Sequence, residues 1–265
     1  MKDFFEKLVT EPWGIAIIAV VALGVWILLS ALLYRPFFKR FYDIVLSGAA
    51  IVVLSPILLL LTVIGAIKMK GNPFFTQLRP GKINRKTGEE KIFKLIKFRT
   101  MTCEKDENGN LLPDEKRLTR YGRILRSTSL DELPELFNIF IGQMSIVGPR
   151  PQLVRDMVFM DEQQRSRHVV RPGLTGLAQV SGRNNMTWEK KFECDLQYIE
   201  KITLWKDIGL IFKTVFKVLK RSDVEREGTV SDIDFGDWLL QEGVILEEYY
   251  QEKQADAKRI LEKIK

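Results

Sequence analysis

Twenty consecutive residues without a charge, residues 14–33, constrain the fold of this chain more than any other feature. A helix of this length crosses a hydrocarbon core about 30 Å thick. Trp13 and Tyr34 bracket the run, where interfacial aromatic residues anchor transmembrane helices. A cleaved signal peptide fits poorly, because acidic residues precede the run and the apolar stretch is too long. We therefore predict an uncleaved transmembrane anchor over residues 1–38.

A second apolar run, residues 44–67, contains Ser55 and Pro56 near its centre. Basic residues flank both ends, and basic flanks favour the cytoplasmic side of a membrane. Proline removes a helical hydrogen bond and bends the helix, and Ser55 can satisfy the carbonyl group that is freed. We expect a re-entrant helix that enters the membrane, bends at Ser55 and Pro56, and returns to the same side. A kinked helix that spans the membrane is the alternative.

The charge of the chain is unevenly distributed. The net charge is +7, but residues 68–126 hold sixteen basic and seven acidic residues, whereas residues 223–265 hold six basic and twelve acidic residues. A basic region beside membrane segments favours phosphorylated substrates or anionic lipid head groups. Nucleic acid is the competing interpretation, and it is weaker because no nucleic-acid motif is present. The basic residues after the first run place residue 1 outside and the bulk of the protein in the cytosol.

Cysteine and histidine usage excludes several kinds of site. Cys103 and Cys194 are isolated, which argues against a zinc site or a disulfide framework and fits a reducing cytosol. His168 is the single histidine, so a Ser-His-Asp triad is a poor explanation of any catalysis.

The remaining residues predict a mainly helical α+β fold with one small β-hairpin. The hairpin strands are expected at residues 74–79 and 92–100, and a mobile loop at residues 104–115. Helices are expected over residues 131–141, 152–168 and 188–201, and a loop over residues 173–182. We divide the chain into the anchor (1–38), a domain that includes the re-entrant helix (39–222), and an acidic helical tail (223–265).

Residues 203–221 form an amphipathic pattern. Apolar residues recur at helical spacing, while lysines occupy the other positions. This pattern fits a helix that lies in the membrane interface, and an ordinary helix that covers a core is the alternative.

Residues 119–151 carry the chemistry that we expect. The adjacent carboxylates Asp131 and Glu132 lie between arginines that include Arg126 and Arg150. Guanidinium groups bind phosphate oxygens in pairs, and carboxylates hold Mg²⁺ or attack phosphorus. Ser129 to Glu132 also matches a helix capping box, and we expect capping to hold the two carboxylates in place.

Two rigid segments follow. Prolines on both sides of Arg150 restrict its backbone, although a plain turn before a helix explains the same pattern. A second Gly-rich basic segment begins at Arg171 and includes Gln179 and Arg183, and it too could be a simple turn.

From about Lys39 to Arg221 the chain resembles the monotopic phosphoglycosyl transferases, bacterial sugar transferases that start glycan assembly. The resemblance rests on an ordered series of motifs: KR-x-x-D from Lys39, the Ser55–Pro56 break, NPFFTQLRPGK, IKFRTM, TRYGRILRSTSLDELPEL, MSIVGPRP, RPGLTGLAQVSGRN and W-x-x-K-x-x-x-D-x-x-Y from Trp188.

The resemblance implies transfer of a sugar 1-phosphate from a UDP-sugar to polyprenyl (undecaprenyl) phosphate, with release of UMP and a requirement for Mg²⁺. Asp131 would attack the β-phosphate and form a phosphosugar intermediate, and Glu132 would hold the Mg²⁺. Arg126 and Arg150 match the phosphate-binding arginines of the family. We add three further phosphate-binding candidates: Lys97, Arg99 and Arg183.

The same resemblance predicts a bacterial inner-membrane protein that acts in the first membrane step of exopolysaccharide, capsule, O-antigen or glycan synthesis. Membrane lipids are expected partners, a homodimer is allowed for, and nucleic acid is not expected. Gln143 stands where many relatives have an acidic residue, which puts one metal or structural contact in question. Two alternatives are a glycosyltransferase with a D-x-D metal site at Asp232 and Asp234, and a non-enzymatic scaffold for polysaccharide export.

Overall fold

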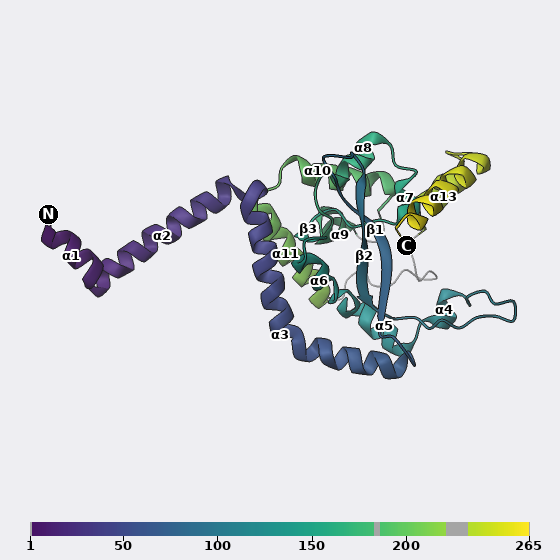
Figure 1. The fold of residues 1–265 in the computed structure, drawn as a ribbon, viewed down its shortest axis with the longest axis horizontal. Coiled ribbons are helices and arrows are strands. Elements are labelled where there is room, and N and C mark those ends of the chain that lie inside the picture. The colour runs from purple at the N-terminus through teal and green to yellow at the C-terminus, as the bar shows by residue number, and fades with distance from the viewer. Residues whose placement is uncertain (1, 183–185, 221–232, 265) are drawn as a thin grey trace.

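Long apolar helices form the N-terminal part of the chain (Figure 1). In the computed structural model, which describes residues 2–182, 186–220 and 233–264, α1 (Lys2–Thr10) leads into α2 (Pro12–Leu32). A short π-helical segment η1 (Tyr34–Phe38) then continues directly into α3 (Lys39–Lys68). Both α2 and the stretch from Tyr34 to Lys68 are long and apolar enough to cross a membrane. The predicted apolar helix at the N-terminus is therefore present as a helix.

Helix α3 is bent. Figure 1 shows its ribbon changing direction about halfway along its length, and Pro56 lies within the helix. The Ser55 hydroxyl donates a 2.8 Å hydrogen bond to the carbonyl oxygen of Val52. That carbonyl lies four residues before Pro56, so it is the one that loses its helical partner. The predicted bend, with serine satisfying the freed carbonyl group, is confirmed.

The start of α3 is fastened to the rest of the protein by the residues of the KR-x-x-D motif. Lys39 Nζ lies 2.6 Å from Asp207 Oδ2, and Arg40 donates to the backbone carbonyls of Ile139 and Phe140. The buried Asp43 accepts hydrogen bonds from the Ser145 hydroxyl and the Ile146 amide. These motif residues therefore hold the helix against the domain.

The predicted hairpin is present. Strands β1 (Phe74–Ile83) and β2 (Glu90–Phe98) pair antiparallel, with Phe74 opposite Phe98, and the pairing shifts register between Pro80 and Ile83. Buried side chains of β2 pack against α6 (Glu135–Phe140), which itself lies along α3. The predicted loop that follows β2 is irregular, apart from one isolated backbone pairing and the helix α4 (Asp114–Arg117).

Two predicted helices are wrong in extent. Residues 131–141 divide into the 3₁₀ turn η2 (Leu130–Glu132) and α6, because Pro134 between them cannot donate a helical hydrogen bond. Residues 152–168 divide into α7 (Val154–Met157), α8 (Glu162–Arg165) and η3 (Ser166–Val169). The Asp161 side chain accepts from the Gln164 amide and so starts a new helix there.

The predicted loop over residues 173–182 is also wrong. It contains β4 (Gly173–Thr175), which pairs parallel with β3 (Ser145–Val147), and then α9 (Leu177–Gly182). A side chain on Gly173 would place its first carbon 2.1 Å from the Gly148 nitrogen. The close approach of these two segments therefore requires glycine.

Helices α10 (Trp188–Glu200) and α11 (Leu204–Lys220) lie where the sequence predicts them, and α12 (Phe235–Gln241) and α13 (Glu247–Glu262) lie in the tail that was expected to be helical. Helix α5 (Arg120–Ser127) was not predicted. Trp205, Phe212 and Phe216 of α11 are exposed, whereas Leu210 is buried. The described part of the tail packs on the domain, where Phe235 joins a buried aromatic cluster and Ala257 contacts Val154 and Met157.

Candidate active site

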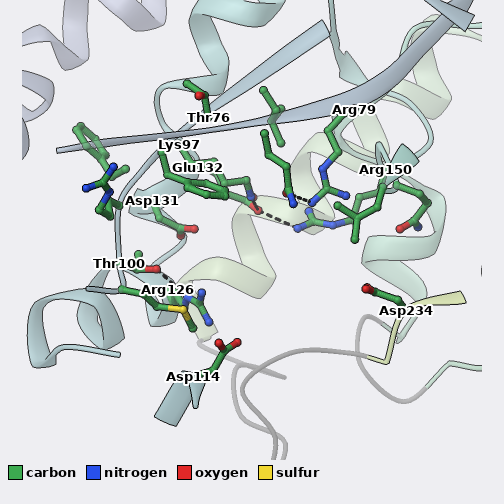
Figure 2. A pocket seen from close by; sticks show the side chains of 18 of the residues that line it. Thr76, Arg79, Lys97, Thr100, Asp114, Arg126, Asp131, Glu132, Arg150 and Asp234 are labelled. Atoms are coloured by element: carbon green, nitrogen blue, oxygen red, sulfur yellow. Dashed lines mark hydrogen bonds and ion pairs between the residues drawn. The ribbon is translucent and has the colours of Figure 1, made fainter. Parts of the chain in front are cut away.

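A pocket of about 990 Å³ opens beside the hairpin (Figure 2). Its walls come from β1, β2, the α5–η2 segment, the loop after β3, the α9–α10 region and the residues that precede α12. The charged side chains that line it are Arg79, Lys97, Arg99, Asp114, Arg117, Arg126, Asp131, Glu132, Arg150, Asp156, Lys191, Asp195 and Asp234. Seven of these side chains are cations and six are carboxylates, so the pocket offers guanidinium groups that can bind phosphate and carboxylates that can bind a metal ion.

The two adjacent carboxylates lie in the 3₁₀ turn η2, and Figure 2 shows both directed into the pocket. Ser129, just before the turn, has a left-handed backbone with φ of 55°, which is uncommon for a residue other than glycine. It makes no side-chain hydrogen bond to the turn. The predicted capping box is therefore wrong, because the Glu132 side chain is directed to two cations instead.

Glu132 is held by Lys97 and Arg150. Its Oε1 atom lies 2.7 Å from Lys97 Nζ and 3.2 Å from Arg150 Nη2. Lys97 also lies 3.1 Å from the buried Glu135. Burial lowers the pKa of Lys97, but the charges of Glu132 and Glu135 outweigh it and raise that pKa overall. Lys97 therefore remains a cation and orients Glu132.

Asp131 differs from its neighbour, because it takes part in no hydrogen bond or ion pair within the described ranges of the chain. Burial raises the pKa of Asp131, and the negative charge of Glu132 raises it further, while Lys97 and the nearby arginines oppose both effects. Burial likewise raises the pKa of Glu135 to about 7. A bound cation, or an anionic substrate that draws the arginines into the pocket, would change the pKa values of these two carboxyl groups.

The backbone of Arg150 is held in place by neighbouring residues. It lies between Pro149 and Pro151, and its backbone carbonyl accepts a 2.7 Å hydrogen bond from Arg167. Arg167 is buried and also pairs with Asp195 at 2.6 Å. The Asp195 of the W-x-x-K-x-x-x-D-x-x-Y motif thus supports the loop that carries Arg150. On the other wall, Arg126 Nε donates to the Thr100 hydroxyl at 3.1 Å.

The pocket brings together most of the predicted site residues: Lys97, Arg99, Arg126, Asp131, Glu132 and Arg150. Arg183 and Asp232 lie outside the described residues. Ser55 and Pro56 belong to α3 and do not line the pocket. Gln143 does not line it either, and its side-chain oxygen accepts a hydrogen bond from Asn138. Gln143 therefore makes a structural contact at the end of α6.

Sequence reasoning missed Arg79, Glu135 and the pocket position of Asp234. Arg79 donates to the Pro151 carbonyl at 3.1 Å, and burial lowers its pKa to about 10. Arg79 belongs to the motif NPFFTQLRPGK, and that motif is the sequence pattern that could have identified it as a site residue. Glu135 stands three residues after Glu132, but its contact with Lys97 depends on β2, which lies far away in sequence.

The residues of the pocket fit a magnesium ion that is shared with a phosphorylated ligand. Within the described parts of the chain, no three His, Cys, Asp or Glu side chains come together as a closed metal site. Mg²⁺ does not require one, since it is commonly held by one or two carboxylates together with substrate phosphates and water. The adjacent Asp131 and Glu132 can supply that small number of ligands.

Comparisons with known proteins agree with this geometry. Residues 34–221 match the bacterial sugar transferase family. The uncharacterized sugar transferase EpsL of Bacillus subtilis is 43% identical over 195 residues, which cover 73% of this chain and 93% of EpsL. The UDP-glucose:undecaprenyl-phosphate glucose-1-phosphate transferases of Klebsiella pneumoniae and Escherichia coli are 41% and 37% identical.

The matches to these two transferases cover 68% of this chain but only 40% and 39% of the relatives. The family match contains the whole pocket apart from Ile233 and Asp234. It also extends over more than half of the chain. The chain therefore belongs to the bacterial sugar transferase family.

Proposed function

We propose that this enzyme transfers a sugar 1-phosphate from a UDP-sugar to undecaprenyl phosphate, releasing UMP and forming undecaprenyl-diphosphate-sugar. Relatives whose names describe a UDP-sugar and undecaprenyl phosphate support the reaction class. The observation that carries the proposal is the placement of Asp131 beside Glu132 in a pocket lined by cations, with Glu132 held between Lys97 and Arg150.

Asp131 is the nucleophile in this proposal. One of its carboxylate oxygens attacks the β-phosphorus of the UDP-sugar, and the bond from that phosphorus to the bridging oxygen breaks. The bridging oxygen keeps the electron pair and leaves as part of UMP. Asp131 suits this role better than Glu132. Glu132 forms ion pairs with Lys97 and Arg150, whereas Asp131 forms neither of these ion pairs.

The second step regenerates the carboxylate. A phosphate oxygen of undecaprenyl phosphate attacks the same phosphorus, and the bond from phosphorus to the Asp131 oxygen breaks. Arg126 and Arg150 would neutralise the phosphate oxygens in both steps, and the proposal gives Lys97, Arg99 and Arg183 the same binding role. In the structure Lys97 contacts carboxylates, so we expect it to orient Glu132 as well.

Glu132 would hold Mg²⁺ beside the diphosphate. The bound ion would supply charge neutralisation for the diphosphate oxygens and the leaving UMP. The arginine-held Glu132 carboxylate presents a fixed oxygen for this purpose.

The lipid acceptor requires a site at the membrane surface, and α3 supports one. Near its start, Asp43 binds Ser145 and Ile146 of the domain. After the bend, Leu58 and Leu61 pack with Phe98 and Leu125 of the same domain. Because both halves of α3 contact one domain, we propose that α3 is re-entrant, with both ends on the cytosolic face of the bacterial inner membrane.

The exposed aromatic face of α11 supports the same placement. Trp205, Phe212 and Phe216 are uncovered, and lysines accompany them on the helix. We propose that this face lies in the membrane interface.

Measurement of UMP release tests the function. The full chain, purified with detergent, is incubated with Mg²⁺ and each of a set of UDP-sugars, first without and then with undecaprenyl phosphate. Without the lipid, we expect one burst of UMP of about one molecule per enzyme and sugar phosphate bound to the protein. With the lipid, we expect continuous turnover.

Asp131→Asn should abolish both the burst and the bound label, whereas Glu242→Gln at the exposed end of α12 should leave both unchanged. Continuous turnover in Asp131→Asn would exclude the aspartyl intermediate. No UMP release with any UDP-sugar would favour the non-enzymatic scaffold over the transferase.

A further inference from the structure

The acidic tail contributes a side chain to the pocket. Asp234 lies directly before α12 and lines the same pocket as Asp131 and Arg150. It lies outside residues 34–221, which match the family. Figure 2 shows Asp234 on the far side of the pocket from Asp131, with its carboxylate directed into the opening.

The residues on either side of Asp234 hold it in this position. The carbonyl of Ile233 accepts a 3.3 Å hydrogen bond from the Trp188 indole, and the amide of Phe235 donates to Asp156 at 2.8 Å. The Phe235 ring is buried against Phe159, Trp188 and Phe192. The Phe235 ring is anchored in the core and the Ile233 backbone is bonded to Trp188, so the Asp234 carboxylate is held at the pocket wall.

Close packing at Gly236, the residue after Phe235, also holds Asp234 in position. A side chain on Gly236 would place its first carbon 2.3 Å from the Phe159 ring. Arg155 also pairs with Asp237 at 2.7 Å and lies 3.0 Å from the Tyr250 hydroxyl. The tail is therefore joined to α7 through several contacts.

Asp234 retains capacity to bind a ligand. Its Oδ2 atom lies 3.3 Å from Arg155 Nη1, while Oδ1 has no hydrogen-bond partner among residues that the structure describes. The side chain is 29% exposed. A carboxylate oxygen accepts hydrogen bonds or binds a metal ion, so its partner is either a hydrogen-bond donor or a cation.

The charge pattern identifies the kind of donor. A carboxylate repels phosphate, so it would weaken binding if it faced the phosphates of the ligand. Arg126, Arg150 and Lys97 lie toward Asp131, where the phosphates belong. The neutral donors of a UDP-sugar are the hydroxyl groups of its ribose and its sugar ring and the N3–H group of its uracil.

We propose that Asp234 accepts hydrogen bonds from neutral donors of the bound nucleotide sugar, on its nucleoside or its sugar ring, so that the tail takes part in substrate selection. This inference rests on the proposed function. A sugar that presents a carboxylate at this wall would be rejected, because two like charges would meet there. The nucleoside and the sugar ring offer the same chemistry, and the experiment separates them.

The test compares three ligands in the full chain with Mg²⁺ present: a UDP-sugar that the protein turns over, UMP and inorganic pyrophosphate. Pyrophosphate has phosphates but no ribose or sugar-ring hydroxyl groups. In Asp234→Asn, we expect binding of the hydroxyl-bearing ligand to weaken about tenfold, since a hydrogen bond to a charged acceptor becomes a neutral one. Pyrophosphate should bind equally or more tightly, because a negative charge is removed.

The two sources of donors give different results. Weaker binding of both UMP and the UDP-sugar assigns the nucleoside, either a ribose hydroxyl or the uracil N3–H group, whereas weaker binding of the UDP-sugar alone assigns the sugar ring. Glu242→Gln removes the same charge nearby on the tail but outside the pocket, and it should change none of the three affinities.

Three results would overturn the inference. Equal weakening of all three ligands would mean that Asp234 acts only on folding, and tighter binding of all three would mean that it acts only through charge. Complete loss of turnover without a change in affinity would favour a D-x-D metal role. A failure of the proposed function is distinct, because it would appear in the unmodified protein as no UMP release.

Discussion

Lys39 at the start of α3 lies 2.6 Å from Asp207 in α11, although 168 residues separate them in the sequence. The hydroxyl groups of Tyr34 and Tyr198 also donate to Asp207, at 2.7 and 2.8 Å. Asp207 is buried, and its two oxygens accept hydrogen bonds from residues that precede the domain and from within it. This cluster therefore joins the membrane helix to the helix with the exposed aromatic face.

Asp207→Asn should destabilise the protein strongly. The change leaves the Lys39 ammonium without its buried partner, and removal of one member of a buried ion pair typically costs about 3–5 kcal/mol. We expect a lower midpoint of thermal unfolding in detergent. Combining Lys39→Met with Asp207→Asn should recover part of the loss, because the uncompensated charge is then absent. A double variant less stable than Asp207→Asn would contradict this account.

The Lys97→Met variant should distinguish the contribution of Glu135 to stability from the contribution of Glu132 to activity. It leaves Glu132 and Glu135 close together without their shared cation, so we expect a loss of about 3–5 kcal/mol in stability and of nearly all UMP release. Adding Glu135→Gln should restore part of the stability, since one of the two uncompensated charges is removed. It should not restore turnover, because Glu132 remains without its support. Recovery of turnover would show that Lys97 does not position Glu132.

The proposed re-entrant path of α3 predicts where new cysteines react. In a Cys103→Ser background, which removes the exposed native thiol, Lys68→Cys should be labelled only by reagents that reach the cytosol. Glu6→Cys on α1 serves as the matched site and should react from outside. Labelling of both positions from outside an intact cell would show that α3 spans the membrane.

Asp156 should make the docking of the tail depend on pH. It is 1% exposed, and burial, followed by the charge of Asp234, raises its pKa to about 6. A raised carboxyl pKa means that the folded state favours the protonated form. This stabilisation is complete below the ordinary pKa of about 3.9 and is lost as the pH rises through about 6.

The measurement is thermal unfolding of the wild type and of Asp156→Asn between pH 5 and pH 7.5. The wild type should lose about 1.4 kcal/mol relative to the variant across this interval, since pH 5 lies one unit below the pKa of about 6. Asp234→Asn should move the transition to lower pH, because the charge of Asp234 helps to raise the pKa. A stability difference between wild type and Asp156→Asn that does not change with pH would refute the shifted pKa.

The local features of the chain were predictable because each depends on near neighbours. The apolar runs became helices, and the Ser55 hydroxyl binds the Val52 carbonyl that Pro56 leaves without a partner. The hairpin appeared at the expected residues, since alternation and turn residues specify it locally. The motif order also placed Asp131, Glu132 and the arginines in one pocket, although their roles remain predictions.

Features that depend on distant partners were not predictable. The capping box at Ser129 fitted its four residues, but Lys97 and Arg150 bind Glu132 instead. β4 forms only because β3 lies beside it, and a three-residue strand carries almost no pattern of its own. The sequence offers Asp234 only as part of an alternative D-x-D site, and its place in the same pocket as Asp131 depends on how the tail packs on the domain.

The sequence by itself determined the apolar character of the N-terminal helices, the bend in α3, and the residue types of the candidate site. Hydrophobicity, proline geometry and charge act over a few residues and can be read directly from them. Only the tertiary structure decided which cation holds Glu132, which half of α3 meets which helix, and that the tail supplies Asp234. Those outcomes depend on buried ion pairs and close packing between segments that are far apart in the chain, and such contacts have no local pattern.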